Sequence, residues 1–266
     1  MTTTSSLPQR SLGGRSGASV SALGLGCWAI GGPWSFDGRP AGWGDVDDAE
    51  SIRAIRRALD LGVTLFDTAD VYGCGHSERV LGRALAGRRD EALIATKFGL
   101  RFDEATRTGG GEDTSPGHIR RACEGSLLRL ATDRIDLLQL HAATGDPDAV
   151  VATLESLVAE GKIRFYGTSN DAPEVIEAFA AGPHCASVQQ QLNVFGGNDA
   201  LAACERTASP RSRGRRSPWA CSRASTVPAE PGRRRTTFAA TPPTGTTSTT
   251  TPFLRGTHAS RRSARR

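Results

Sequence analysis

The sequence predicts an α/β fold on a parallel sheet, a (β/α)8 barrel represented by about six βα units. Short apolar runs alternate with amphipathic segments, a pattern typical of βαβ units with right-handed crossovers. Polar residues stand where the apolar runs end, and parallel folds place their chemistry at these strand ends. Gly24 and Gly26 lack the third glycine of a dinucleotide-binding fingerprint and precede a loop, which favours a barrel over an open sheet.

The predicted elements follow from periodicity and from turn residues. Glycines at 13, 14 and 17 separate two alternating runs, which predicts a hairpin that plugs the base of the barrel. In chain order we expect this hairpin at 10–22, strands at 23–28, 63–67, 92–97, 135–141, 163–169 and 186–192, and helices that begin after Asp47 or Asp48, at 77–85, after Ser115, and at 147–159, 172–181 and 198–206.

Two long loops separate these elements. Residues 99–115 are polar and are expected to be a loop throughout. Residues 29–45 are rich in Gly and Pro and contain Trp34 and Trp43. Together with Trp28, these tryptophans indicate a loop that lines or covers a pocket.

Charge divides the chain into two parts. Residues 207–266 hold thirteen arginines and one acid, a charge of +12, so the remaining residues balance at −7 within the total of +5. This segment has few large apolar side chains and no periodicity, and it is expected to be a disordered basic tail. We therefore divide the chain into a flexible 1–9, a partial barrel at 10–206 and the tail.

Compartment and metal content follow from weaker signals. The six cysteines lack metal-ligand spacing and are typical of reduced cytosolic thiols, so we expect no metal. Residues 1–6 lack the apolar segment of a signal peptide. No apolar run approaches the ~20 residues of a membrane span, and a cytoplasmic protein is expected. Nothing in the sequence indicates an oligomeric state.

The strand ends at 67 and 97 carry the clearest chemical signal. Asp67 closes one strand, Tyr72 follows five residues later, and Lys97 closes the next strand. Lys97 is one of only two lysines in a chain that uses arginine almost everywhere else. A carboxylate, a phenol and an amine are thus expected to converge at one edge of the sheet.

These residues belong to a larger set that resembles the aldo-keto reductases over residues 10–206. The matching segments are Gly24-Leu25-Gly26-Cys27-Trp28, the run from Asp67 to Tyr72 with Gly73, Lys97, His141 after Leu137-Leu138-Gln139-Leu140, Gly161-Lys162-Ile163-Arg164, Gly167-Thr168-Ser169-Asn170 and Gln189. Each lies at or near a predicted strand end.

The resemblance implies reduction of an aldehyde or ketone by NADPH, with a small-molecule carbonyl compound as the partner. It assigns Tyr72 as general acid, Lys97 as the cation that lowers the pKa of Tyr72, Asp67 as the carboxylate that neutralises Lys97, and His141 as the group that orients the carbonyl.

The same resemblance implies the residues that bind cofactor and substrate. Cofactor contacts are expected from Gly26, Cys27, Trp28, Asp67, Ser169, Asn170 and Gln189, and substrate contacts from Trp28 and Trp34. The preference for NADPH over NADH also comes only from the resemblance.

Three alternative functions belong to different classes of protein. A non-catalytic barrel that binds the nicotinamide cofactor is disfavoured by the complete set Asp67, Tyr72, Lys97 and His141. A nucleic-acid partner is disfavoured because the basic tail lacks interleaved aromatics and a known fold. A Schiff-base aldolase with Lys97 as nucleophile is disfavoured because Asp67 and Tyr72 would keep the lysine charged.

The resemblance ends near Arg206, where the family continues with two more strands and a helix that binds the adenosine phosphate. We predict a frameshift near codon 206. A six-stranded barrel has two open edges, so we also predict that the chain as written is poorly soluble or inactive. The nucleotide sequence is the measurement: a shifted frame should encode strands seven and eight. A soluble chain that oxidises NADPH would contradict the second expectation.

Overall fold

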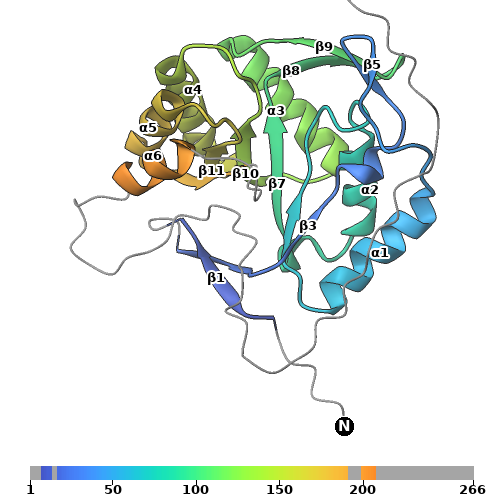
Figure 1. Cartoon of the computed structure of the whole chain (residues 1–266). Coiled ribbons are helices and arrows are strands. Elements are labelled where there is room, and N and C mark those ends of the chain that lie inside the picture. The colour runs from blue at the N-terminus through green and yellow to red at the C-terminus, as the bar shows by residue number, and fades with distance from the viewer. Residues whose placement is uncertain (1–6, 14–16, 191–198, 208–266) are drawn as a thin grey trace, which may run out of the picture. The chain divides into compact units, whose positions relative to one another are not determined.

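A six-stranded parallel sheet forms the centre of the fold. The structure is a computed structural model that describes residues 7–13, 17–190 and 199–207. Neighbouring strands follow the order β12-β11-β10-β7-β6-β3, and each pair is parallel (Figure 1). The strands are β3 (Gly24–Gly26), β6 (Leu65–Asp67), β7 (Leu93–Phe98), β10 (Ile135–Leu140), β11 (Ile163–Thr168) and β12 (Cys185–Val188). The predicted parallel sheet of six βα units is confirmed.

Helices follow the strands and pack on the outer face of the sheet. They are α1 (Asp48–Asp60), α2 (His76–Ala84), α3 (Pro116–Leu130), α4 (Pro147–Ala159), α5 (Pro173–Ala181) and α6 (Asp199–Thr207), with short 3-10 turns η1 (Ala29–Gly31) and η2 (Arg89–Glu91). Asp47 caps α1 by accepting from the backbone N–H groups of Ala49 and Glu50, which resolves the choice between Asp47 and Asp48.

Alternation along the strands separates two faces. In β7, Ile94 and Phe98 belong to the main core beneath the helices, whereas Leu93 and Ala95 belong to a second cluster inside the curved sheet. Successive side chains of a strand point to opposite faces, so Lys97 shares the inner face with Leu93 and Ala95. The polar end of β7, at Lys97, therefore lies on the inner face of the curved sheet.

The predicted hairpin closes the base of this inner face. β1 (Gln9–Leu12) pairs with β2 (Ala18–Ser21) in antiparallel register. Leu12 and Val20 pack against inner-face residues of three strands, Leu93, Ala95, Leu137 and Ala186. The first strand begins at Gln9, so that residue of the predicted flexible segment is ordered, while residues 1–6 lie outside the described residues.

The two predicted loops differ most from expectation, because they form a second sheet. It contains β4 (Ser35–Phe36), β5 (Arg39–Pro40), β8 (Leu100–Asp103) and β9 (Thr108–Glu112), in the order β5-β4-β9-β8. The prediction of a loop throughout 99–115 was wrong. Glycines 109–111 carry no strand pattern, and their pairing partner β4 lies some seventy residues earlier in the chain. We call these four strands the capping sheet (Figure 1).

The central sheet stays open among the described residues. β3 and β12 are its two edges, and no described strand joins them. The last predicted strand, 186–192, is seen as Cys185–Val188, and positions 191–192 lie outside the described ranges, as does the predicted tail from 208 onward. Within the described part of the chain, no helix has the length and apolarity needed to cross a membrane.

A buried carboxylate ties the amino ends of three strands together. Asp136 of β10 is 2% exposed and binds Arg89 at 2.6 Å and Arg164 of β11 at 2.9 Å. Its Oδ2 also accepts from the backbone N–H of Ile94 in β7, at 3.0 Å. This single side chain therefore fixes the register of β7, β10 and β11.

Asp136→Ala should lower the free energy of unfolding by about 3 kcal/mol, because it leaves the half-buried Arg89 guanidinium without its charge partner. Urea or thermal unfolding measures the loss. Asp133→Ala is the matched control, since Asp133 is 84% exposed and binds only the neighbouring Arg134. Equal losses in the two variants would contradict a special role for Asp136.

Candidate active site

The carboxyl ends of β6, β7 and β10 bring four predicted residues together. Asp67 ends β6, Lys97 lies one residue before the end of β7, and His141 follows β10. Gln139 pairs with Lys97 across the sheet, so the strand ends are level. Tyr72 lies in the turn after β6. A Cβ at Gly73 would collide with the carbonyl oxygen of Gly31, so glycine lets this turn pack closely beside η1.

The Lys97 ammonium is at the centre of the site. Its Nζ donates to Asp67 Oδ1 at 2.7 Å, to the carbonyl oxygen of Thr68 at 2.9 Å and to the Tyr72 hydroxyl at 3.2 Å. Lys97 is 2% exposed, and these three acceptors match its three protons. The side chain is therefore held by the acceptors that surround it and has no donor left for solvent.

Burial and the charge of Lys97 act in opposite directions on Tyr72. Burial acts to lower the pKa of Lys97, but Asp67 and Tyr72 hold that pKa above its ordinary value. Burial raises the pKa of Tyr72, and the nearby ammonium acts to lower it, in the direction that the prediction gave for Lys97. The net pKa of Tyr72 lies above its ordinary value, because desolvation of a phenolate outweighs the attraction of one ammonium.

His141 faces Tyr72 as a neutral imidazole. The two rings meet edge to face with centroids 5.8 Å apart. Burial, assisted by the positive charge of Lys97, lowers the pKa of His141 to about 3. Its Nδ1 is buried and has no hydrogen-bond partner among the described residues. A neutral ring beside the phenol can donate or accept one hydrogen bond from a ligand.

Two glutamines complete the environment of Asp67. Gln189 donates to Asp67 Oδ2 at 3.1 Å, and Gln139 reaches the same oxygen at 3.5 Å and Gln189 at 3.3 Å. Gln139 was not among the predicted site residues. Its signal in the sequence was a polar residue within the apolar run of β10, two positions before His141 and therefore on the same face.

The remaining predicted cofactor residues lie at neighbouring strand ends. Cys27 and Trp28 follow β3, and the Cys27 backbone N–H donates to the carbonyl of Asp67 at 2.8 Å. Burial, with a contribution from Asp67, raises the pKa of the Cys27 thiol to about 12, so it stays protonated. A Cβ at Gly26 would meet open space, which leaves its backbone accessible to a ligand.

Ser169 and Asn170 follow β11. The Asn170 amide donates to the carbonyl of Ala142 at 2.9 Å and accepts from the N–H of Ala172 at 2.8 Å. Both ends of this side chain are thus used by neighbouring backbone. The Ser169 hydroxyl has no partner among the residues that the structure describes, and it is the freer of the two groups.

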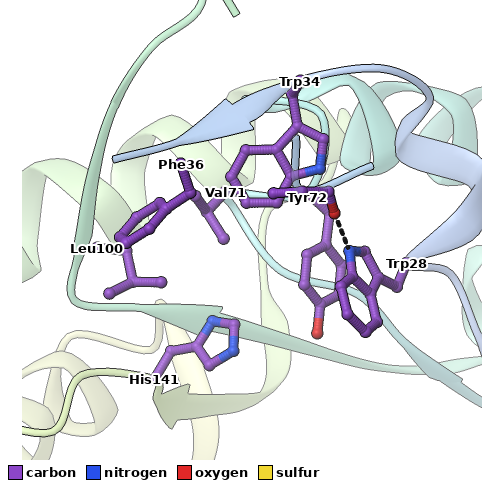
Figure 2. A pocket seen from close by; sticks show the side chains of 8 residues that line it. Trp28, Trp34, Phe36, Val71, Tyr72, Leu100 and His141 are labelled. Atoms are coloured by element: carbon purple, nitrogen blue, oxygen red, sulfur yellow. Dashed lines mark hydrogen bonds between the residues drawn. The ribbon is translucent and has the colours of Figure 1, made fainter. Parts of the chain in front are cut away.

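An aromatic cavity of about 290 Å³ lies above the Tyr72 hydroxyl. Figure 2 shows Trp28 beside the Tyr72 ring and His141 across the hollow; the rings of Trp28 and Tyr72 stack with centroids 5.9 Å apart. The cavity is lined by Trp28, Trp34, Phe36, Ala41, Val71, Tyr72, Leu100 and His141. The capping sheet contributes Phe36 and Leu100, which sequence reasoning did not place in the site.

Trp28 and Trp34 thus lie where the sequence placed them, at the cavity wall. The Trp28 indole donates to the carbonyl of Ala41 at 3.2 Å, which holds the ring against Tyr72. Trp43 packs edge-on against Trp28 and is 69% exposed, so it covers the outer side of the wall. Among the described residues, no cluster of three His, Cys, Asp or Glu side chains could hold a metal ion.

Comparison with known proteins agrees with the fold and the site. A sequence profile of the aldo/keto reductase family matches residues 22–207. The match covers the sheet, its helices and all four central residues. The chain belongs to the aldo/keto reductase family.

Individual relatives extend beyond the chain. It is 34% identical to the uncharacterized oxidoreductase YqkF and 37% identical to the aldo-keto reductase YhdN, both of Bacillus subtilis. The alignments cover 68% and 67% of this chain but 55% and 52% of those proteins. The chain therefore spans about half the length of the curated relatives it matches.

Solved structures of aldo-keto reductases also match this chain over part of their own length. The holo form of aldo-keto reductase AKR11C1 from Bacillus halodurans matches with a TM-score of 0.61 and 34% identity, over 70% of this chain and 58% of that one. An aldo/keto reductase from Klebsiella pneumoniae, in complex with NADP and acetate, matches with a TM-score of 0.58 and 31% identity, over 74% and 64%.

Lys97→Met should raise the pKa of Tyr72 further, because the ammonium that donates to the phenol oxygen is removed. The pH titration of the tyrosine ζ-carbon signal measures this change, with circular dichroism to check folding. Lys162→Met is the matched control, since Lys162 binds Glu124 and Glu160 on the surface. An unchanged or lower Tyr72 pKa in Lys97→Met would contradict the assignment.

Proposed function

We propose that this site reduces an aldehyde or ketone to an alcohol by hydride transfer from NADPH, with Tyr72 as the general acid. One observation supports the proposal above all: the Tyr72 hydroxyl lies 3.2 Å from a buried ammonium and opens into an apolar cavity opposite His141. A carbonyl that accepts a hydride needs a proton at its oxygen, and Tyr72 contributes a phenolic hydroxyl to the residues that line the cavity.

The hydrogen-bond directions suit this role. Lys97 donates to the oxygen of Tyr72, so the phenolic hydrogen is free to donate to a carbonyl in the cavity. The raised pKa keeps the phenol protonated at neutral pH. When the proton leaves, the tyrosinate faces an ammonium at hydrogen-bond distance, which stabilises the charge that develops.

His141 and the cavity wall would orient the substrate. The neutral imidazole can donate one hydrogen bond to the carbonyl oxygen without competing for the proton of Tyr72. Trp28, Trp34 and Leu100 line the apolar side of the cavity, where the carbon skeleton of a carbonyl compound would pack. The Schiff-base alternative needs a neutral lysine, whereas Asp67 and Tyr72 raise the pKa of Lys97.

The residues fit the nicotinamide end of the cofactor. Gly26 ends β3 with open space beside it, and Ser169 follows β11 with a hydroxyl that has no partner among the described residues. Asn170 and Gln189 each use one amide hydrogen within the protein and keep a second, so with Trp28 these groups would hold the ring and its carboxamide. NADPH, when bound, supplies the hydride. The preference for NADPH is supported by relatives crystallised with NADP or NADPH.

We also expect turnover to be impaired, because both edges of the described sheet are unpaired. A cytoplasmic location and a small-molecule carbonyl partner are part of the same proposal. A barrel that binds the cofactor without catalysis is the alternative, and Tyr72 distinguishes the two.

Tyr72→Phe should lower the single-turnover rate of NADPH oxidation with an aldehyde by about 10²-fold or more, because the general acid is lost. NADPH binding, followed by its fluorescence, should persist. Tyr166→Phe is the matched control, because the chain has two tyrosines and the Tyr166 hydroxyl binds Glu155 away from the site. Equal rates in Tyr72→Phe and the unmodified chain would contradict the role of Tyr72 as general acid. Rates no faster than the enzyme-free background in both proteins would favour the non-catalytic barrel.

A further inference from the structure

The segment after His141 is held by a carboxylate from the capping sheet. Glu112 Oε1 accepts from the backbone N–H of Ala143 at 3.1 Å, and Oε2 accepts from the backbone N–H of Thr144 at 2.9 Å. The Thr144 hydroxyl donates to the same Oε2. One side chain thus receives three hydrogen bonds from two successive residues, which begin two positions after His141, the residue that faces Tyr72.

Glu112 links this segment to the cavity wall. It is the last residue of β9 and pairs with Leu100 at the start of β8, and Leu100 lines the cavity. The other end of the segment is fixed by the His141 N–H, which donates to the carbonyl of Phe98 in β7 at 2.8 Å. His141 therefore lies between an anchor in the central sheet and an anchor in the capping sheet.

The contacts involve a charged acceptor, which makes them stronger than neutral hydrogen bonds. Burial acts against the charge, yet the donors of Thr144 and Ala143 hold the pKa of Glu112 below its ordinary value. Glu112 and His141 also interact electrostatically. Ala142 is held separately by Asn170, so the backbone of the segment is fixed from both sides.

We propose that Glu112 is a positioning residue for His141, one that holds residues 141–144 so that the imidazole faces Tyr72 across the cavity. The inference rests on the proposed function, because it assigns His141 a substrate-orienting role. Glu112 does not contact the cavity atoms itself. Its effect passes through the backbone of Ala143 and Thr144, and small errors in such placement lower rates strongly.

The first test is structural and needs no turnover. In the unmodified chain the amides of Ala143 and Thr144 should be protected from hydrogen exchange, and the His141 and Tyr72 rings should show a nuclear Overhauser effect. In Glu112→Ala, both the exchange protection and the nuclear Overhauser effect should be lost. Asp103→Asn should keep them, since Asp103 lies on the same hairpin and its carboxylate accepts from Thr106 and Ala105 within its own turn.

The second test is a double-mutant cycle on kcat/KM for an aldehyde. Glu112→Ala should lower kcat/KM by about 10- to 100-fold. It should have no further effect in a His141→Ala background, because the group it positions is gone. Glu112→Gln keeps one acceptor oxygen and should fall between the unmodified chain and Glu112→Ala.

The possible results distinguish the positioning role of Glu112 from the proposed function of the site. Retained exchange protection and an unchanged ring contact in Glu112→Ala would overturn the positioning role, as would additive losses in the cycle. Loss of the ring contact in Glu112→Ala, together with normal turnover in Tyr72→Phe, would leave Glu112 as a positioning residue and contradict only the role of Tyr72 as general acid.

Discussion

The ion pair between Lys97 and Asp67 is the contact on which the site depends. An ammonium that is 2% exposed is tolerable only when acceptors replace its water, and Asp67, Thr68 and Tyr72 supply one each. Asp67 in turn binds Gln189, so a single chain of polar contacts crosses the inner face from β12 to β7. Removal of either charge would leave its partner buried and unpaired.

Sheet geometry explains why these groups meet at all. Parallel pairing sets Lys97 level with Gln139 and Asp67 level with Ala95, two residues before Lys97, and alternation turns Asp67, Lys97 and Gln139 to the same inner face. The hairpin of β1 and β2 fills the apolar base of that face. On this inner face the polar side chains of Asp67, Lys97 and Gln139 lie toward the carboxyl ends of the strands, and the capping sheet contributes Phe36 and Leu100 to the cavity at that end.

Burial and the charge of Lys97 set the protonation states of Tyr72 and His141. Burial raises the pKa of Tyr72 and lowers that of His141, and the charge of Lys97 opposes the first effect and reinforces the second. The result is a protonated phenol beside a neutral imidazole over a wide pH range. The cavity offers an uncharged donor pair to a carbonyl oxygen, with a positive charge held behind the phenol.

The sequence by itself determined the six parallel strands, their helices and the hairpin, and it predicted that Asp67, Tyr72 and Lys97 meet at one edge of the sheet, because periodicity and strand-end position are local properties. His141 was expected from the family resemblance alone. Only the tertiary structure decided the capping sheet, since β4 and β9 pair across a long stretch of chain without a strand pattern in either. It also decided the direction of the Tyr72 pKa shift and the roles of Gln139 and Glu112. These depend on burial and on contacts between distant segments, which no local pattern encodes.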